Sequence, residues 1–211
     1  MKDTKEKILE TALGMFADYG FAGASTRELS KRANVNISAI NYYFASKEGL
    51  YLSVIEYIID LIKKDNKEII ELLAPYKDKK LDKDTAIKVF KVLIDNLIDR
   101  ILKADVFPIV MMLIRETVKP SIGSDLIYKE ITLPFYSLLS VVISSIIDID
   151  IDKKMAIIIM YTIFGQATSF IGYKSTVLKT LELKDFDDKT IELIKEVVLK
   201  QSFIILNSYK N

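Results

Sequence analysis

The stretch Ser25 to Ile55, STRELSKRANVNISAINYYFASKEGLYLSVI, decides the fold of this 211-residue chain. It opens on Ser25-Thr26-Arg27-Glu28, the pattern of a capping box, in which a hydroxyl and a carboxylate satisfy free backbone N–H groups at the start of a helix. Asn34 tolerates the left-handed backbone of a tight turn, and Asn36 can cap a further helix that ends at Phe44. The stretch therefore predicts two short helices joined by a tight turn.

The sequence before this stretch predicts one more helix. Residues 4 to 19 place apolar side chains on one helical face, and Gly20 then supplies a stop. Together the three helices form a predicted helix-turn-helix domain of residues 1 to 47, whose last helix can enter the major groove of DNA. Ser46 caps a long fourth helix, expected from about 47 to 73.

The rest of the chain, residues 48 to 211, is predicted to be a helical bundle. Only 7 Gly and 4 Pro interrupt the sequence, and apolar residues recur mostly at helical spacing. A polar connector is expected at Lys77 to Asp84, and breaks near Asp105, Pro120, Asp148 to Asp152 and Lys184 to Asp188. The expected helices lie at about 84–103, 105–118, 123–147, 152–174 and 187–208. The predicted fold class is all-α, with about nine helices.

Composition excludes most catalytic sites. The chain has no His and no Cys, so disulfides, thiolate zinc sites, cysteine nucleophiles and histidine acid/base chemistry are absent. An enzyme would need a carboxylate or lysine site, and no paired acidic motif on an apolar face indicates one. We expect no enzyme activity, no cofactor and no metal site. The N-terminus, MKDTKEK, alternates charge and lacks the apolar segment of a signal peptide, which predicts a cytoplasmic protein.

The stretch that begins at Ser25 closely resembles the signature of the TetR family of transcriptional regulators. The matching points are Thr26 and Arg27, Val35 in the turn, Tyr42-Tyr43-Phe44, and Lys47. Residues Asn36 to Tyr51, together with Arg115-Glu116 and Pro120, are similar to the CecR (YbiH) subgroup. The chain departs from the general pattern by having Asn34 where Gly is usual, Ser30 where Ala is usual, and Asn41 where an aromatic residue is common. Of these, Asn41 is expected to alter base preference.

The resemblance implies a set of DNA contacts. Ile37, Ser38, Ala39 and Asn41 face base edges, and Asn41 suits an adenine. Thr26, Tyr42, Tyr43 and Lys47 resemble the phosphate contacts of the family, and Arg27 can reach a guanine. Between residues 25 and 47, four basic residues against one acidic residue leave a local charge of +3, although the whole chain carries only +1. The predicted set is Thr26, Arg27, Asn36, Ile37, Ser38, Ala39, Asn41, Tyr42, Tyr43 and Lys47.

The family also places a ligand pocket among the middle helices. Aromatic, methionine and polar side chains there predict an amphipathic or aromatic ligand. The predicted ligand residues are Met111, Arg115, Glu116, Tyr136, Tyr161, Phe164, Gln166 and Phe170. Arg115 and Glu116 are charged groups on an apolar helix and need partners. They either orient a polar group of the ligand or pair within the protein, and the sequence leaves both possibilities open.

Two segments carry no charge, residues 131 to 147 and 155 to 173. The second has nearly the length of a membrane span, but it contains Gln166, threonines and two glycines, and no asymmetric basic cluster flanks it. We therefore predict the buried centre of a bundle and no membrane contact. In the family, the last two long helices pair two subunits, and Ile191, Ile194, Val198, Phe203 and Leu206 are expected to supply apolar surface for this role.

The resemblance thus implies a ligand-responsive repressor that binds a near-palindromic operator as a homodimer and is released by a small-molecule inducer. Activation in place of repression stays open. The alternative hypothesis is a helical partner-binding or membrane-associated protein without DNA binding.

Overall fold

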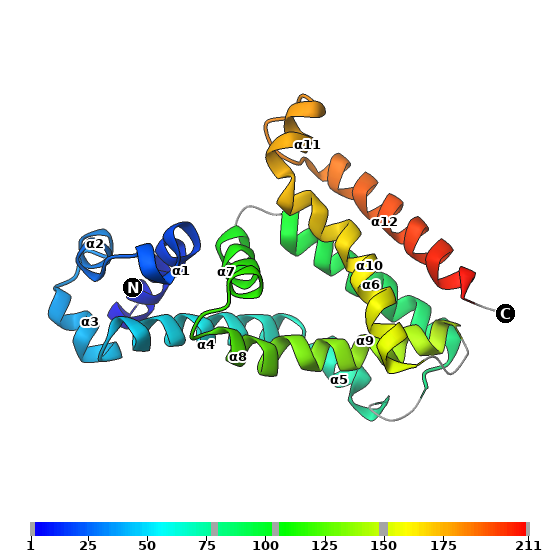
Figure 1. Ribbon diagram of the computed structural model, residues 1–211, viewed down its shortest axis with the longest axis horizontal. Coiled ribbons are helices and arrows are strands. Elements are labelled where there is room, and N and C mark those ends of the chain that lie inside the picture. Colours follow the sequence, from blue (N-terminus) through cyan, green and yellow to red (C-terminus); the bar gives the residue numbers. More distant parts are fainter. Residues whose placement is uncertain (1–2, 77–79, 103–105, 148–151, 210–211) are drawn as a thin grey trace. The chain divides into compact units, whose positions relative to one another are not determined.

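The structure is a computed structural model that describes residues 3–76, 80–102, 106–147 and 152–209. All regular secondary structure in these ranges is helical, which confirms the predicted all-α class (Figure 1). The chain divides into two compact units. The first unit comprises residues 1–67 and 105–133, and the second comprises residues 68–104 and 134–211.

The first unit contains the predicted three-helix domain and the helices that support it. Its helices are α1 (Thr4–Gly23), α2 (Thr26–Arg32), α3 (Ile37–Phe44), α4 (Lys47–Asp65), α7 (Phe107–Val118), α8 (Ser124–Ile127) and the π-helical turn η3 (Tyr128–Thr132). Helix α1 packs against both α4 and α7. The core of the unit is built around Phe16, Ile40, Phe44 and Tyr51, each no more than 5% exposed. Burial of these apolar faces holds α2 and α3 in place.

The turns of the first unit largely follow the sequence. Gly20 breaks α1 with a φ of 69°, and Asn34 adopts the predicted left-handed backbone with a φ of 51°. Asn36 caps α3 by accepting from the N–H of Ser38 at 2.9 Å. These observations confirm the three expected signals, and they fix where each helix of the domain begins or ends.

The predicted capping box of α2 is only half present. Ser25 Oγ accepts from the backbone N–H of Glu28 at 3.4 Å, as expected. The carboxylate of Glu28 is directed to Arg32 Nε at 3.0 Å, one turn further along the helix, because an ion pair at this spacing is available to it. Of the two predicted capping contacts only the serine cap is formed, and Glu28 instead makes an ion pair with Arg32 on the surface of α2.

The turn between α3 and α4 is very tight. Ala45 has φ 63° and ψ −43°, and Ser46 N donates to Phe44 O at 2.7 Å, which closes a γ-turn. Ser46 Oγ then caps α4 by accepting from Gly49 N at 3.0 Å. A Cβ atom at Gly49 would overlap the carbonyl oxygen of Phe44. Glycine is required at position 49 because the backbone of α3 approaches α4 so closely.

The second unit is a bundle in which α6, α10 and α12 pack against one another. The rings of Phe90 on α6 and Phe203 on α12 meet edge to face at 5.5 Å. Ser145 Oγ, on α9, accepts from the backbone N–H of Leu81 at 2.9 Å. The elements of the unit are α5 (Lys67–Leu73), η1 (Ala74–Tyr76), α6 (Lys83–Leu102), α9 (Leu133–Ile147), α10 (Lys153–Gly172), α11 (Lys174–Thr180) and α12 (Asp188–Ser208).

Two predicted helices are interrupted. The expected helix 47–73 ends at Asp65 and resumes at Lys67, because Asn66 turns its side-chain amide back onto the carbonyl of Ile62 at 2.7 Å. The expected helix 123–147 passes through η3 before α9 begins. Helix α11 was not predicted. The expected break near Asp105, most of that at residues 148 to 152, and the first residues of the connector at 77 to 84 lie outside the described residues.

Two helical segments of the described chain are long and apolar enough to cross a bilayer, Ser124–Ile147 and Lys154–Gly172. Core helices of soluble proteins meet the same criterion. One face of the second segment packs against α6 and α12 within its own unit, but only 28% of the segment is buried, so it is not the fully buried centre that the sequence predicted.

The α3–α4 turn gives a stability prediction. We expect Gly49→Ala to lower the free energy of unfolding by about 2 kcal/mol or more, because a backbone carbonyl has to move to admit the methyl group. Gly14→Ala is the matched control, since a Cβ at this position in α1 meets nothing within 4 Å. The control should raise stability by about 0.5–1 kcal/mol through helix propensity. Urea unfolding followed by circular dichroism measures both, and equal effects at the two positions would contradict the role of Gly49.

Candidate functional site

Helix α3 turns one face outward and buries the other. Tyr42 is 83% exposed, Ile37 is 43% exposed, and Ser38 and Asn41 are also exposed. Ile40 and Phe44 are buried in the core of the first unit. Among the residues predicted to face base edges, Ala39 differs, because it is partly buried and packs against that core. The outward face is thus formed mainly by Ile37, Ser38, Asn41 and Tyr42.

The two polar residues at the start of α3 are engaged in the cap. Asn36 Oδ1 accepts from both the backbone N–H and the hydroxyl of Ser38, each at 2.9 Å. Both side chains are exposed, so the cap lies on the surface. Tyr43 is 38% exposed, and its ring packs edge to face with that of Tyr42 at 5.1 Å. Both tyrosines are therefore exposed, Tyr42 far more than Tyr43.

The remaining predicted DNA contacts, Thr26, Arg27 and Lys47, lie at the start of α2 and α4. Arg27 is exposed and Thr26 is partly buried. Lys47 Nζ lies 3.5 Å from the carbonyl oxygen of Ala22 and 4.9 Å from the ring centroid of Phe21. These contacts hold the Lys47 ammonium beside the segment that leads into α2. Sequence analysis missed Phe21, whose contact depends on folding across 26 residues.

Arg115 and Glu116 both have partners within the first unit. Arg115 Nη2 donates to the carbonyl oxygens of Ala17 and Asp18, at 3.0 and 3.2 Å. Glu116 is 3% exposed, and its carboxylate accepts hydrogen bonds from the Tyr51 hydroxyl and from Ser121. This geometry matches the second of the two possibilities that the sequence left open, pairing within the protein. No sequence signal identified Tyr51, which is 65 residues away from Glu116.

The other predicted ligand residues divide between the two units. Met111 belongs to α7 of the first unit, where it is partly buried against the core. In the second unit, the rings of Tyr136 and Tyr161 lie 5.0 Å apart, and those of Phe135 and Phe164 lie 5.2 Å apart. The structure thus brings Tyr136, Tyr161 and Phe164 together between α9 and α10. Phe170 packs instead against Phe186 at 6.5 Å.

Two polar side chains, one on α9 and one on α10, could interact with a polar ligand group. Burial raises the pKa of the Tyr136 phenol, and its hydrogen bond to Tyr161 raises it further, so Tyr136 stays protonated at neutral pH. On the same helix as Tyr161, the buried Oε1 atom of Gln166 finds no hydrogen-bond partner among the described residues. A buried carbonyl oxygen of this kind is an acceptor that a ligand donor could satisfy.

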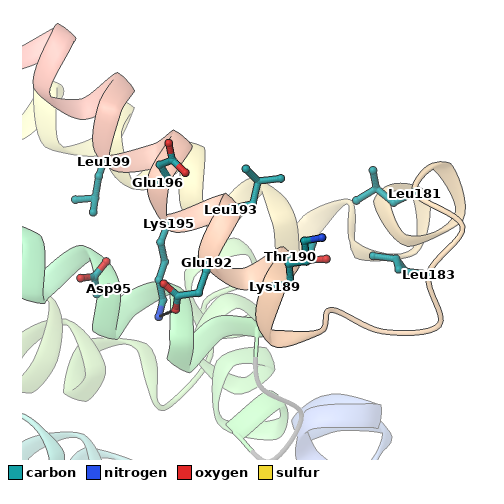
Figure 2. A pocket seen from close by; sticks show the side chains of 10 residues that line it. All are labelled: Asp95, Leu181, Leu183, Lys189, Thr190, Glu192, Leu193, Lys195, Glu196 and Leu199. Carbon is teal, nitrogen blue, oxygen red and sulfur yellow. Dashed lines mark hydrogen bonds and ion pairs between the residues drawn. The ribbon is translucent and has the colours of Figure 1, made fainter.

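A groove of about 770 Å³ opens elsewhere in the second unit, between the α11–α12 turn, α12 and Asp95 of α6 (Figure 2). Its lining mixes leucines with charged side chains and includes none of the predicted ligand residues. On its floor, Lys195 pairs with Glu192 at 2.7 Å and with Asp99 at 3.0 Å. Burial lowers the pKa of Lys195, but these hydrogen bonds outweigh it and hold the pKa above its usual value. Sequence analysis missed this buried lysine.

The comparisons with known proteins agree with this geometry. The family model of the bacterial regulatory proteins of the tetR family matches residues 8–54. The model of the C-terminal domain of the HTH-type transcriptional dual regulator CecR matches residues 86–208, more than half of the chain. The chain belongs to the TetR family. Its C-terminal domain is of the CecR type, so the predicted family and subgroup are both confirmed.

Relatives of this TetR-family chain match it over different lengths, either nearly the whole chain or a short part of it. The dual regulator CecR of Shigella flexneri is 28% identical over 97% of this chain and 92% of its own length. The probable regulator YttP of Bacillus subtilis is 51% identical, but over 47 residues only, which are 22% of this chain and 23% of YttP. The match to YttP thus covers a short part of the chain, whereas the match to CecR extends over nearly all of it.

Solved structures of TetR regulators share the fold. AibR, determined in complex with isovaleryl coenzyme A and operator DNA, superimposes with a TM-score of 0.71 at 14% identity, covering 94% of this chain and 97% of AibR. AmtR of Mycobacterium smegmatis gives a TM-score of 0.62 at 14% identity, covering 99% of this chain and 92% of AmtR. Sequences this different share an architecture, and it is the architecture alone that the likeness establishes.

Proposed function

We propose that this TetR-family regulator is a cytoplasmic, ligand-responsive repressor that binds a near-palindromic operator as a homodimer. The observation that carries the proposal is the outward face of α3, which presents Ile37, Ser38 and Asn41 while Ile40 and Phe44 anchor the helix from behind. A short helix anchored in this way and preceded by a tight turn is what major-groove recognition requires.

We divide the predicted DNA contacts into residues that read base edges and residues that bind phosphates. Asn41 carries an amide that can accept from and donate to an adenine edge, and the Ile37 side chain can contact a thymine methyl group. Lys47, Thr26, Tyr42 and Tyr43 are suited to phosphates, which position the domain without reading sequence. Glu28 is paired with Arg32, so the positive field near the phosphates comes chiefly from Arg27, Lys31 and Lys47.

Dimerisation is supported by exposed apolar surface on α10 and α12. Leu193, Val197 and Ile204 recur at helical spacing on one face of α12, and Met155, Ile158 and Tyr161 are exposed on α10. All six are 42 to 62% exposed. A stable dimer buries about 800 Å² on each partner, and these exposed apolar side chains are suited to form part of such an interface. A second copy of this chain is the proposed occupant.

This surface differs from the one predicted from sequence. Ile191, Ile194, Val198 and Leu206 are at most 6% exposed, and Phe203 packs on Phe90. They form the inner face of α12 because α6 and α10 of the same chain cover it. For these four buried residues the prediction that they supply dimer surface is wrong, whereas Phe203 is only partly buried. In our proposal the opposite face of α12 takes the role.

For release, we propose that a small molecule binds the body and shifts α4, the helix that begins at Lys47. An amphipathic or aromatic ligand fits the cluster of Tyr136, Tyr161 and Phe164, with Gln166 as a polar anchor. Such a ligand must bind the released state more tightly than the DNA-bound state, and a 10- to 100-fold loss of operator affinity requires about 1.4 to 3 kcal/mol of coupling.

Because base contacts and phosphate contacts have different effects on DNA binding, we predict different defects for Lys47→Ala and Asn41→Ala. On a duplex selected from a random pool, Lys47→Ala should weaken specific and non-specific binding alike and reduce the salt slope by about one unit, because one phosphate contact is lost. Asn41→Ala should cost about 1–3 kcal/mol on the selected duplex only. Fluorescence anisotropy titrations at several salt concentrations measure both. A changed sequence preference for Lys47→Ala, or selected and unrelated duplexes weakened equally by Asn41→Ala, would contradict the assignment.

The proposed dimer surface predicts a monomeric variant. Leu193→Glu combined with Val197→Glu places two charges in the interface and should weaken the dimer at least about 100-fold, or about 2.8 kcal/mol. Sedimentation velocity at micromolar concentration measures the change, with circular dichroism confirming that helix content is kept. Val92→Glu is the control, since Val92 is 46% exposed on α6 of the same unit. A double variant that stays dimeric would rule out this surface.

A further inference from the structure

Two adjacent charged residues of α7 make all their described contacts with the scaffold beneath the DNA-reading helices. We infer that Arg115 and Glu116 are positioning residues for α2 and α3, although the buried Nε atom of Arg115 has no hydrogen-bond partner among the described residues. The inference rests on the proposed function only in taking α2 and α3 as the elements that read DNA. Its evidence lies entirely within the first unit.

Arg115 holds the end of α1. Its Nη2 atom donates to Ala17 O and Asp18 O, which lie in the last turn of α1 before the break at Gly20. A guanidinium at a helix C-terminus satisfies these carbonyls and interacts favourably with the helix dipole. A Cβ at Gly20 would lie 3.0 Å from Arg115 Nη1, so the absence of a side chain at this break also admits the guanidinium.

Glu116 holds α4 through a buried hydrogen bond. Its carboxylate accepts from the Tyr51 hydroxyl, from Ser121 Oγ, and from Ser121 N at 3.0 Å. A buried carboxylate is stable only with such donors. Burial raises the pKa of the Tyr51 phenol, and the hydrogen bond to Glu116 raises it further, so Tyr51 remains a donor.

Tyr51 connects this bond to the segment that leads into α2. Its ring packs edge to face with Phe16 at 4.8 Å and with Phe21 at 5.1 Å. Phe21 lies between the Gly20 break and the Ser25 cap of α2, and Lys47 Nζ contacts both its ring and the next carbonyl. The segment of residues 20 to 25 is therefore held from α7 by Arg115 and from α4 chiefly by the buried Tyr51.

This arrangement separates two kinds of DNA binding. Reading base edges requires α3 in one orientation, whereas attraction to phosphates requires only the positive charge. Loosening the segment of residues 20 to 25 should therefore lower affinity for the selected duplex and leave affinity for unrelated DNA nearly unchanged. A role in global stability alone would lower the folded fraction without changing the ratio of the two affinities.

The test compares Tyr51→Phe, Glu116→Gln and the double variant on the selected duplex and on an unrelated one. Tyr51→Phe removes the hydroxyl that donates to Glu116 and keeps the aromatic ring. Glu116→Gln replaces one carboxylate oxygen, an acceptor, with an amide NH2 group that would face the donor groups of Tyr51 and Ser121. Each single variant should bind the selected duplex about 10-fold more weakly and the unrelated duplex less than about 2-fold more weakly. The double variant should lose well under 100-fold, because both changes affect the Tyr51–Glu116 hydrogen bond and their effects are not additive. Tyr128→Phe, at an exposed tyrosine of the same unit, is the control and should change neither affinity.

Amide hydrogen exchange, measured without DNA, completes the test. Residues 20 to 25 should exchange about 10-fold faster in Tyr51→Phe and at the wild-type rate in Tyr128→Phe. Unchanged exchange in Tyr51→Phe, equal losses on both duplexes, or a double variant with the product of the single losses would each overturn the inference. Failure of the wild-type chain to select any DNA would overturn the proposed function instead, and the exchange measurement would still decide the positioning role.

Discussion

The first unit depends on the burial of Tyr51. Its ring fills the space between Phe16 and Phe21, and its hydroxyl satisfies the carboxylate of Glu116. One side chain of α4 thereby contacts α1, the segment that leads into α2, and α7. Because these neighbours are fixed from inside, α3 can expose polar and apolar side chains together without losing its position.

The same packing explains how a domain with so small a core can present an exposed helix. Helix α3 contributes only Ile40 and Phe44 as fully buried anchors. The carbonyl of Phe44 also lies against Gly49, so the two helices meet backbone to backbone. Because the backbones of α3 and α4 are in direct contact, a shift of one helix displaces the other. A movement of α4 therefore reaches α3 through the turn at Ala45.

The sequence predicted local features well and distant ones poorly. The left-handed Asn34, the Asn36 and Ser46 caps and the break at Gly20 all depend on a few neighbouring residues, and the structure has each of them. Ser121 lies five residues from Glu116, but the other partners of Arg115 and Glu116 lie 65 to 98 residues away, and no local pattern identifies them. The sequence also indicated the inner face of α12 as the dimer surface, and this question too depends on distant residues. Both faces carry apolar residues, and only the positions of α6 and α10 decide which one is covered.

The central claim is that two copies of α3 face one duplex at the same time. Hydroxyl-radical footprinting of the wild-type protein on a duplex selected from a random pool tests it most directly. The account predicts two protected patches related by two-fold symmetry, with centres about one helical turn or a multiple of it apart. A single unsymmetrical patch, or no protection on any selected duplex, would contradict it.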